Sequence, residues 1–346
     1  MSRPRLNAIF QQQIPGDHAL LELAQRRFSE GGLGAEFYPD TPDHLRFLLR
    51  FRPHSPDEYT VHLPRHIDIL NPAGRETVCA FAAVADASAT GFVLHDQVEA
   101  ATRFAEYTAA VRQLDAQLDR QAARPLIFIE YAAWLEPATF VALHEALRDV
   151  AGVGACVDIG HIGLFHCYRA FEEEHPGLRV AKLKAHTPEL RIHVDRVQEA
   201  CATALPGVLQ VVASLGRLGK PMHFHLHDGH PSSTFSSVGV SDHLSFFQEV
   251  PIPFSYRGSH TLQMLFGPVG VHRVVMAARS FLPDERLSFT LEIHAPQGRQ
   301  ELGEYAPLFS HWGDTADAER MQYWIEVLLR NHRLLQGACE PAGERA

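Results

Sequence analysis

The sequence lacks several features that mark whole classes of protein. No apolar run approaches the roughly 18 consecutive residues that a membrane-spanning helix needs. The first ten residues lack the apolar stretch of about 7–15 residues and the small-residue cleavage site of a signal peptide. We therefore predict a cytoplasmic protein that does not contact a membrane.

Paired cysteines and basic charge are also scarce. The five cysteines are odd in number, scattered and free of any C-x-x-C pair, which argues against a disulfide framework and a cysteine-rich zinc knuckle. Lys and Arg number 31 against 41 Asp and Glu, a formal net charge of −10. This balance repels a polyphosphate, so the sequence disfavours nucleic acid as a partner.

Nucleotide-binding motifs are missing as well. No G-x-G-x-x-G follows the first strand-like run, and no G-x-x-x-x-G-K-[ST] occurs anywhere. The chain has 346 residues, of which 46% are apolar, and this is enough for a large core. It also contains 22 histidines. Imidazole is the commonest metal ligand and titrates near physiological pH, so the positions of the histidines are informative.

Short β-rich apolar runs alternate with longer helical patterns along the chain. The eight strand-like runs are Leu6–Phe10, Gly34–Tyr38, Tyr59–Leu63, Gly91–His95, Leu126–Glu130, Ala155–Asp158, Met222–His227 and Ser288–Ile293. The helical patterns lie at 17–30, with Asp17 as N-cap, 41–50, 98–122, 136–149, 189–215 and 268–281. Regular alternation of this kind predicts a parallel sheet with right-handed crossovers.

Eight such units predict an α/β fold, a (β/α)8 TIM barrel that forms a single domain over residues 1–346. The spacing of the runs predicts long insertions after strands 6 and 7, at about 162–220 and 229–265. A helical tail at about 314–336 follows the last strand. A doubly wound open sheet is the rival topology, and the missing glycine fingerprint disfavours it.

Residues that can bind a metal stand at the carboxyl ends of six of the eight runs. They are His62, His95, Glu130, Asp158 with His161, His225 with Asp228, and Glu292. The carboxyl ends of barrel strands meet at one rim, so we expect Glu130, Asp158, His225 and Glu292 to face one another. Three carboxylates and an imidazole repel strongly in a partly dry site unless a cation is present. The sequence therefore predicts a centre for a divalent Mn, Mg, Co or Zn ion.

Each of these residues also has a plainer interpretation. A single glutamate that ends an apolar strand is more often a solvated loop residue, and His62 or His95 alone can equally be a hydrogen-bonded rim residue. His223 and His227 alternate with His225 and point the same way, so only some of the three can be ligands. Because metal-binding residues occur together at six of the eight strand ends, we favour the metal centre over these plainer interpretations.

The strand-end residues resemble the xylose-isomerase-like TIM-barrel superfamily, which groups sugar and sugar-phosphate isomerases and epimerases with endonuclease IV. Asp158-Ile-Gly-His161 is similar to its D-x-x-H signature and His225-Leu-His-Asp228 to its H-x-x-D, within a resemblance that runs from Leu6 to Ala295. It implies one divalent ion bound by the four facing residues, with His161 close to the substrate.

The endonuclease branch of that superfamily implies further ligands. His62 and His95 match its histidines on strands 3 and 4, and Asp242 with His243 is similar to its D-x-H element. The match departs from the pattern in two places: Asp242 adjoins His243 directly, and Asp96-Gln97 rather than Pro-Gly follows His95. Both departures weigh against a trinuclear nuclease centre.

The resemblance implies an isomerase or epimerase that acts on a sugar, sugar phosphate or related polyol or hydroxy-carbonyl substrate. Glu130 and Glu292 would transfer a proton at a metal-chelated centre, and Arg191 or Lys184 would meet a phosphate or carboxylate. Two alternatives stay open: a metal-dependent hydrolase or phosphodiesterase of endonuclease IV type, and a barrel that binds a metabolite without turnover. The apolar segment Phe246–Phe254 is a candidate contact for a homo-oligomer.

Overall fold

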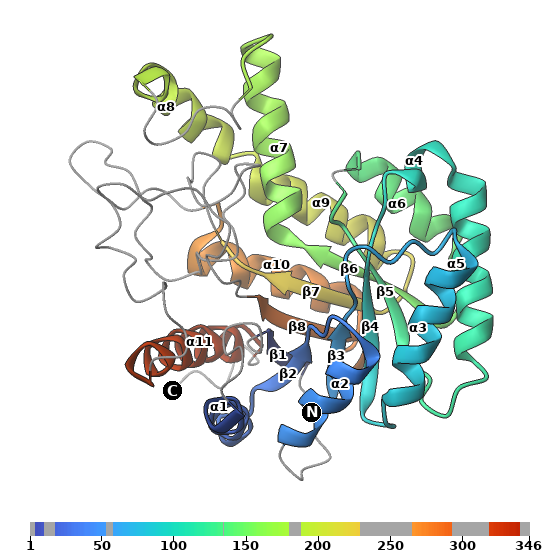
Figure 1. Cartoon of the computed structure of the whole chain (residues 1–346). Helices are drawn as coiled ribbons and strands as arrows, with labels where there is room; N and C mark the ends of the chain where they lie inside the picture. Colours follow the sequence, from blue (N-terminus) through green and yellow to red (C-terminus); the bar gives the residue numbers. More distant parts are fainter. Residues whose placement is uncertain are drawn as a thin grey trace. The chain divides into compact units, whose positions relative to one another are not determined.

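Eight parallel strands form a closed barrel in which spatial order follows sequence order, so the predicted (β/α)8 TIM-barrel architecture is confirmed (Figure 1). The computed structural model describes residues 4–9, 18–52, 58–133, 135–179, 188–228, 265–292 and 318–339. The strands are β1 (Arg5–Ile9), β2 (Gly34–Phe37), β3 (Tyr59–His62), β4 (Ala89–His95), β5 (Leu126–Glu130), β6 (Val153–Asp158), β7 (Met222–Leu226) and β8 (Leu287–Glu292). Each lies within two residues of its predicted bounds.

Helices occupy most of the connections between the strands. They are α1 (His18–Glu30), α2 (Pro42–Leu48), α3 (Pro72–Val84), α4 (Glu99–Thr102), α5 (Phe104–Leu118), α6 (Pro137–Ala146), α7 (Ile159–Glu174), α8 (Pro188–Cys201), α9 (Ala204–Gly216), α10 (Gly267–Phe281) and α11 (Ala318–Cys339). Two short 3-10 turns cover Leu49–Phe51 and Asp284–Arg286. The predicted N-cap Asp17 lies outside the described residues.

The structure corrects the predicted helices in four places: two predicted helices are each divided in two, and helices α3 and α7 were not predicted. The pattern at 98–122 is two helices, because the backbone leaves the helical region at Arg103, between α4 and α5. The pattern at 189–215 is likewise two helices, α8 and α9. Helix α3 was not predicted, although Asn71 caps it by accepting a hydrogen bond from the Ala73 N–H and a proline follows at the first helical position.

The chain divides into two compact units. The first comprises residues 1–158, 211–224 and 278–290, and the second comprises 159–210, 225–277 and 291–346. Strands β7 and β8 each begin in the first unit and end in the second. The predicted single domain over 1–346 stays a prediction.

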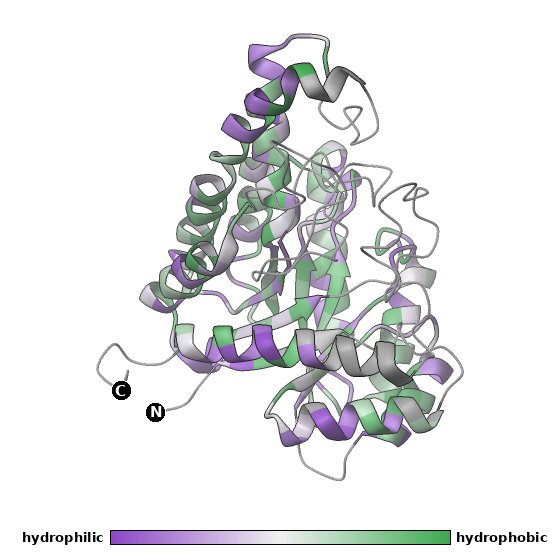
Figure 2. Cartoon of the chain, turned by 90° about the vertical axis from the view of Figure 1, so that its left-hand side faces the viewer, coloured by the Kyte–Doolittle hydropathy of each residue, from purple (hydrophilic) through white to green (hydrophobic). Residues whose placement is uncertain are grey.

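The first unit has an apolar interior within its strands. Figure 2 shows hydrophobic residues concentrated along the strands, whereas the helices alternate hydrophobic and hydrophilic stretches. Inside the barrel, Phe128 packs with Val93 and Cys156. Its ring needs a glycine on the neighbouring strand, because a Cβ atom at Gly91 would lie 2.3 Å from Phe128 Cε2.

The second unit contains helices α7, α8 and α11 and parts of α9 and α10. The chain passes from the last residue of β6 directly into α7, so Asp158 ends the strand and His161 lies in the first turn of the helix. The stretch Ile192–Gly216 is long and apolar enough to cross a membrane by composition, but half of it is buried. A core helix of a soluble protein meets the same criteria, and the stretch is broken between α8 and α9.

Candidate metal centre

The register of the first strands places the predicted ligands on the inner face of the barrel. His95 pairs with Glu130 across β4 and β5, and Glu130 pairs with Cys156 across β5 and β6. Neighbours in a parallel sheet point to the same side, and side chains two residues apart share a face. His95, Glu130 and Asp158 therefore belong to one inward-facing set at the carboxyl ends of their strands.

His62, His95 and Glu130 bring three ligand atoms together in the first unit. His95 Nε2 lies 3.0 Å and His62 Nε2 lies 3.2 Å from Glu130 Oε2, and the two Nε2 atoms are 3.3 Å apart. Metal–ligand bonds of about 2.0–2.2 Å put neighbouring ligand atoms about 3.0–3.5 Å apart. The triangle thus has the size that a single divalent ion requires.

The hydrogen bonding of His62 strengthens this interpretation. Its Nδ1 lies 3.2 Å from the carbonyl oxygen of Leu63, and a carbonyl can only accept, so Nδ1 carries the hydrogen in this contact. In the neutral ring Nε2 then holds a lone pair that faces the carboxylate oxygen of Glu130. These two electron-rich atoms, 3.2 Å apart, are stabilised by a metal ion or proton between them, or by a hydrogen that His95 Nε2 donates.

Burial governs the ionisation of the groups around this triangle. Burial lowers the pKa of His95, against the opposing effect of Glu130, so its ring is available as a neutral ligand. Burial also raises the pKa of Asp96 to about 7, although its carboxylate accepts hydrogen bonds from the backbone N–H groups of Ala132 and Ala133. Asp96 thereby ties the end of β4 to the residues that follow Glu130.

The second unit holds two further predicted ligands in contact with each other. His225 Nδ1 lies 3.3 Å from Glu292 Oε2, and both side chains are almost fully buried. Asp228 accepts hydrogen bonds from the backbone N–H groups of Phe266 and Gly267, at 3.2 and 2.6 Å, and so caps the start of α10. Asp228 as a metal or substrate ligand stays a prediction.

His161 lies in the first turn of α7 and is half-buried. Its ring meets that of His227 edge to face, with centroids 5.8 Å apart. His227 also lies against the helix backbone, because a Cβ atom at Gly160 would be 1.8 Å from His227 Cε1. Only glycine lets the N-terminus of α7 approach this ring.

The four ligands predicted to share one ion divide between the units: Glu130 and Asp158 end β5 and β6, and His225 and Glu292 lie at the ends of β7 and β8. Their joint coordination stays a prediction. Asp242, His243 and Lys184 lie outside the described residues, as does the segment 246–254.

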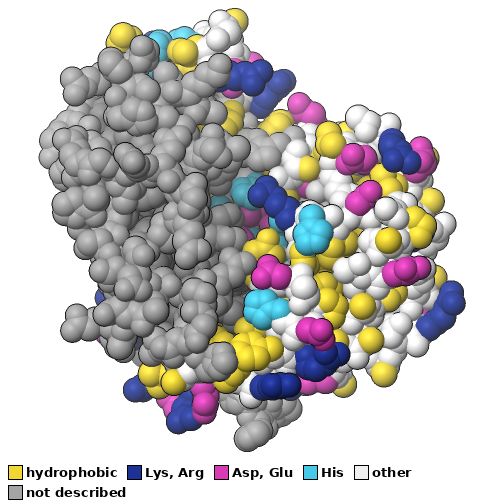
Figure 3. All heavy atoms as spheres, viewed as in Figure 1, with side chains coloured by type: hydrophobic (Ala, Val, Ile, Leu, Met, Phe, Trp, Pro, Cys, Tyr) yellow, Lys and Arg dark blue, Asp and Glu magenta, His cyan; other side chains and the backbone are white. Residues whose placement is uncertain are grey.

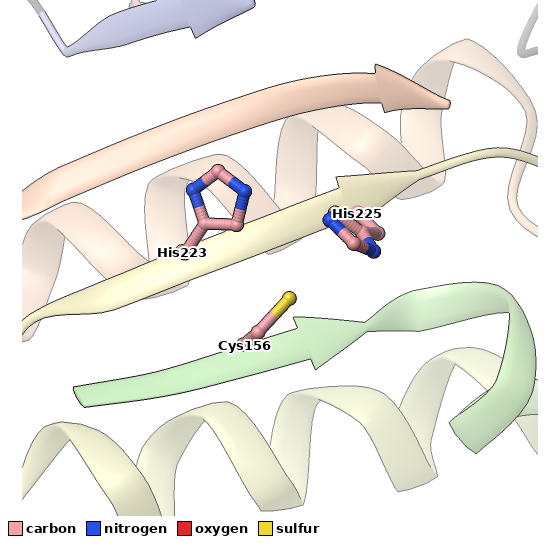
Figure 4. Close-up of side chains that lie close together, drawn as sticks. All are labelled: Cys156, His223 and His225. Atoms are coloured by element: carbon pink, nitrogen blue, oxygen red, sulfur yellow. The ribbon is translucent and has the colours of Figure 1, made fainter. Parts of the chain in front are cut away.

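Sequence reasoning missed the buried polar residues beneath the rim. Glu36, on β2, is fully buried, and His223 uses both ring nitrogens, one toward Glu36 Oε2 and one toward Ser288 Oγ, each at 2.7 Å. Figure 4 shows His223 and His225 on β7 and the Cys156 thiol on neighbouring β6 directed toward that strand. Because its nitrogens are engaged, His223 is better suited to a structural role than to metal binding.

The outer surface differs from this interior. Acidic, basic and apolar side chains are interspersed over the described part of the face in Figure 3. Glu130, Asp158, His225 and Glu292, by contrast, are buried at the ends of their strands. Together, the fold and these residues define a (β/α)8 barrel with buried His, Asp and Glu groups that could hold a metal ion.

Comparisons with known proteins add little to this description. No family model matches the chain, and no curated protein matches it. One solved structure that is similar to it is described as a citrate lyase from Burkholderia xenovorans LB400. It is 13% identical, with a TM-score of 0.39, over 99% of this chain and 95% of that one. A likeness this distant carries nothing about substrate or reaction.

Proposed function

We propose that the protein is a divalent-metal-dependent isomerase or epimerase of a sugar, sugar phosphate or related hydroxy-carbonyl compound. The observation that carries the proposal is that four consecutive barrel strands, β5 to β8, each present a buried metal-binding side chain at the carboxyl end. These side chains are Glu130, Asp158, His225 and Glu292.

The chemistry of the donors supports a hard or borderline divalent ion. Three carboxylates and one imidazole suit Mn, Mg, Co or Zn ions, and in this proposal the four side chains share one ion. When bound, the ion holds two neighbouring substrate oxygens and polarises a carbonyl group. The carboxylates would then gain the opposite charge that their burial requires.

Proton transfer is assigned to Glu130 and Glu292. Their strands, β5 and β8, are separated by two strands on one side of the closed barrel and by four on the other. In this proposal the two carboxylates act on opposite faces of the substrate carbon. One removes a proton from the substrate carbon and the other returns it, which inverts the centre or moves the carbonyl. His161, at the start of α7, orients the substrate hydroxyl groups.

A substrate screen tests this assignment. The purified protein, loaded in turn with Mn²⁺, Mg²⁺, Co²⁺ or Zn²⁺, should interconvert an aldose and a ketose, or two epimers, among sugars and their phosphates. Glu130→Gln and Glu292→Gln should each lower turnover at least about a thousandfold while the circular-dichroism spectrum stays unchanged. Retention of activity in either variant contradicts the acid–base roles.

Metal content gives a separate check on the ligands. His225→Ala should lower the bound metal measured by plasma emission, because it removes a buried nitrogen donor. His175→Ala is the matched control, since this histidine follows the last residue of α7 and packs against Phe171 and His193. Equal metal content in the two variants would contradict the assigned ligand set.

A metal-dependent hydrolase is the second candidate, and the His62–His95–Glu130 triangle favours it. A second ion held by these residues would share Glu130 with the first. Paired ions stabilise the attacking and leaving oxygens of a displacement, as in hydrolysis of a phosphoester. The isomerase needs one ion per chain, whereas the hydrolase needs two or more.

Counting ions and following phosphoester hydrolysis separates the two candidates. For a hydrolase we expect two ions per chain, a fall to one in His62→Ala, and release of phosphate or alcohol from a phosphoester. His66→Ala, at an exposed histidine of the same β3–α3 connection, should keep the full count. One ion per chain in the wild type, unchanged in His62→Ala, would rule out the hydrolase centre.

A further inference from the structure

Glu36 lies at the centre of a hydrogen-bond network inside the barrel. A single oxygen of its carboxylate, Oε2, accepts hydrogen bonds from the hydroxyl groups of Thr60, at 2.6 Å, and Thr290, at 2.7 Å. His223 Nε2 lies 2.7 Å from the same oxygen, and His223 Nδ1 contacts Ser288 Oγ at 2.7 Å. Each of these five side chains is at most 1% exposed.

The network connects strands that are far apart in the sequence. Glu36 and Thr60 are partners in the register of β2 and β3, whereas His223 lies on β7 and Thr290 on β8. Strand β1 stands between β8 and β2 in the closed barrel. One carboxylate oxygen therefore joins both sides of β1 through the barrel interior, at the place where the barrel closes.

The other strands have apolar side chains at the same level. Val93 on β4, Phe128 on β5 and Cys156 on β6 form an apolar cluster beneath His95, Glu130 and Asp158. A buried polar network is stable only when each polar atom has a hydrogen-bond partner. The hydrogen bonds on the polar side therefore restrict the positions of the strands more than apolar packing does.

The network residues stand two positions before residues of the candidate metal centre. Thr60 precedes His62, His223 precedes His225, and Thr290 precedes Glu292 on their strands. Side chains two residues apart lie on the same strand face, so fixing one fixes the direction of the other. If the Glu36 carboxylate moves, we therefore expect the residues at the carboxyl ends of β3, β7 and β8 to move with it.

We propose that Glu36 is a positioning residue for the metal centre. Its carboxylate oxygen sets the relative register of β2, β3, β7 and β8 and thereby the placement of His62 and of the β7 and β8 ligands. The inference rests on the proposed metal-dependent function. Glu36 itself binds neither metal nor substrate in this scheme.

Two substitutions at Glu36 separate an acceptor role from mere packing. Glu36→Gln keeps one carbonyl oxygen that can accept from all three donors, whereas Glu36→Leu keeps similar bulk and removes the acceptor. Cobalt(II) titration followed by visible absorption should give an affinity within about threefold of wild type for Glu36→Gln. For Glu36→Leu we expect at least about a tenfold loss, as for other groups that orient ligands.

Val93→Ala is the matched control on the apolar half of the same layer. It should lower the thermal midpoint, because it leaves a cavity, without changing cobalt affinity at temperatures where the protein stays folded. If Glu36→Leu does not fold, Thr290→Val takes its place, since it removes one donor to Glu36 at constant shape. A weakened affinity and an altered cobalt absorption band are expected for Thr290→Val.

The outcomes separate this inference from the proposed function. Wild-type protein that binds no cobalt overturns the metal centre and the inference with it. Wild-type protein that binds cobalt, with unchanged affinity in folded Glu36→Leu or in Thr290→Val, overturns the inference alone. A loss in Glu36→Gln as large as in Glu36→Leu also overturns it, because the retained acceptor should suffice.

Discussion

Two regions of the first unit bury histidine in different ways. At the rim, the Nε2 atoms of His62 and His95 converge on one oxygen of Glu130. On α6, His144 is 1% exposed, packs edge-on against Phe140, and has no hydrogen-bond partner for either ring nitrogen among the described residues. Burial, helped by nearby Lys220, lowers the pKa of His144 to about 3. A buried histidine therefore marks a functional site only where its nitrogens converge with other donors.

The largest expected effect is a loss of metal affinity at the rim. His95→Ala should weaken metal binding at the His62–His95–Glu130 triangle by about a hundredfold, because it removes one of three converging donors. Competition with a chromogenic zinc chelator measures the loss. His144→Ala should leave the affinity unchanged, and equal losses in the two variants would erase the distinction between the regions.

The next effect concerns Lys220, the charged group of the α6 region. Its ammonium is buried and donates hydrogen bonds to the carbonyl oxygens of Leu147 and Val150, at 2.6 and 2.5 Å, just beyond the end of α6. Lys220→Met should lower the free energy of unfolding by about 2–3 kcal/mol, because these carbonyls lose a charged donor. Urea unfolding at pH 7 measures the change.

Arg148→Ala, at an exposed position next to these carbonyls, is the control for Lys220→Met and should change stability by less than about 0.5 kcal/mol. Equal stability of Lys220→Met and wild type would show that the buried ammonium contributes nothing to this region.

Asp96, next to His95 at the rim, makes the stability of the folded protein depend on pH. Its pKa is about 7 in the folded protein, raised by burial, against about 3.9 in an unfolded chain. The folded state therefore binds more protons between these values, so this contribution to stability is complete below about pH 4 and is lost as pH rises through about 7.

Asp96→Asn removes this pH dependence and should leave stability near wild type at pH 4 while raising it by at least about 1–2 kcal/mol at pH 8. Thermal unfolding in a metal chelator measures both values. Asp86→Asn is the control, since hydrogen bonds from Ser88 and Arg52 lower the pKa of Asp86 against the effect of burial. A variant less stable than wild type at pH 8 would contradict the expected sign.

At pH 8, a substitution of His144 should give the smallest effect on stability. His144 has a pKa near 6.5 in the unfolded chain and about 3 in the folded protein. Between these values the unfolded chain binds the proton and the folded protein does not, so this histidine lowers stability as pH falls through that range. His144→Leu should reduce the acid sensitivity and change stability at pH 8 by less than about 1 kcal/mol. Unfolding midpoints at pH 5 and pH 8 test this, and an unchanged difference between them would contradict it.

The barrel could be predicted from the sequence because each strand is a short apolar run, and six of the eight runs carry a metal-competent residue at or just beyond the carboxyl end. The same local pattern placed Glu130 and Asp158 at the last position of their strands and Glu292 within one residue of it. Helix breaks were harder to predict: Arg103 has no strong breaking propensity, so nothing local distinguishes α4 and α5 from one long helix. Helix α3 was predictable in principle, from Asn71 followed by proline.

Glu36 could not be identified from the sequence for a physical reason. A lone glutamate in Gly34–Tyr38 has the pattern of a strand with one solvated side chain, and what makes it different is the arrival of Thr60, His223 and Thr290 at one oxygen. These partners lie up to 254 positions from Glu36 in the sequence. Long-range convergence of this kind is not visible in local periodicity.

The order of the strands along the chain has a consequence for biosynthesis. Strands β1 to β6 are complete by residue 158, but β7 starts at residue 222 and β8 at residue 287. Contacts between distant segments form slowly, since the intervening chain loses entropy when its ends meet. When β1 to β6 pair before β7 and β8 are synthesised, β1 and β6 have unpaired edges, and such edges recruit other chains. Pairing of β7 and β8 closes the barrel and removes both edges.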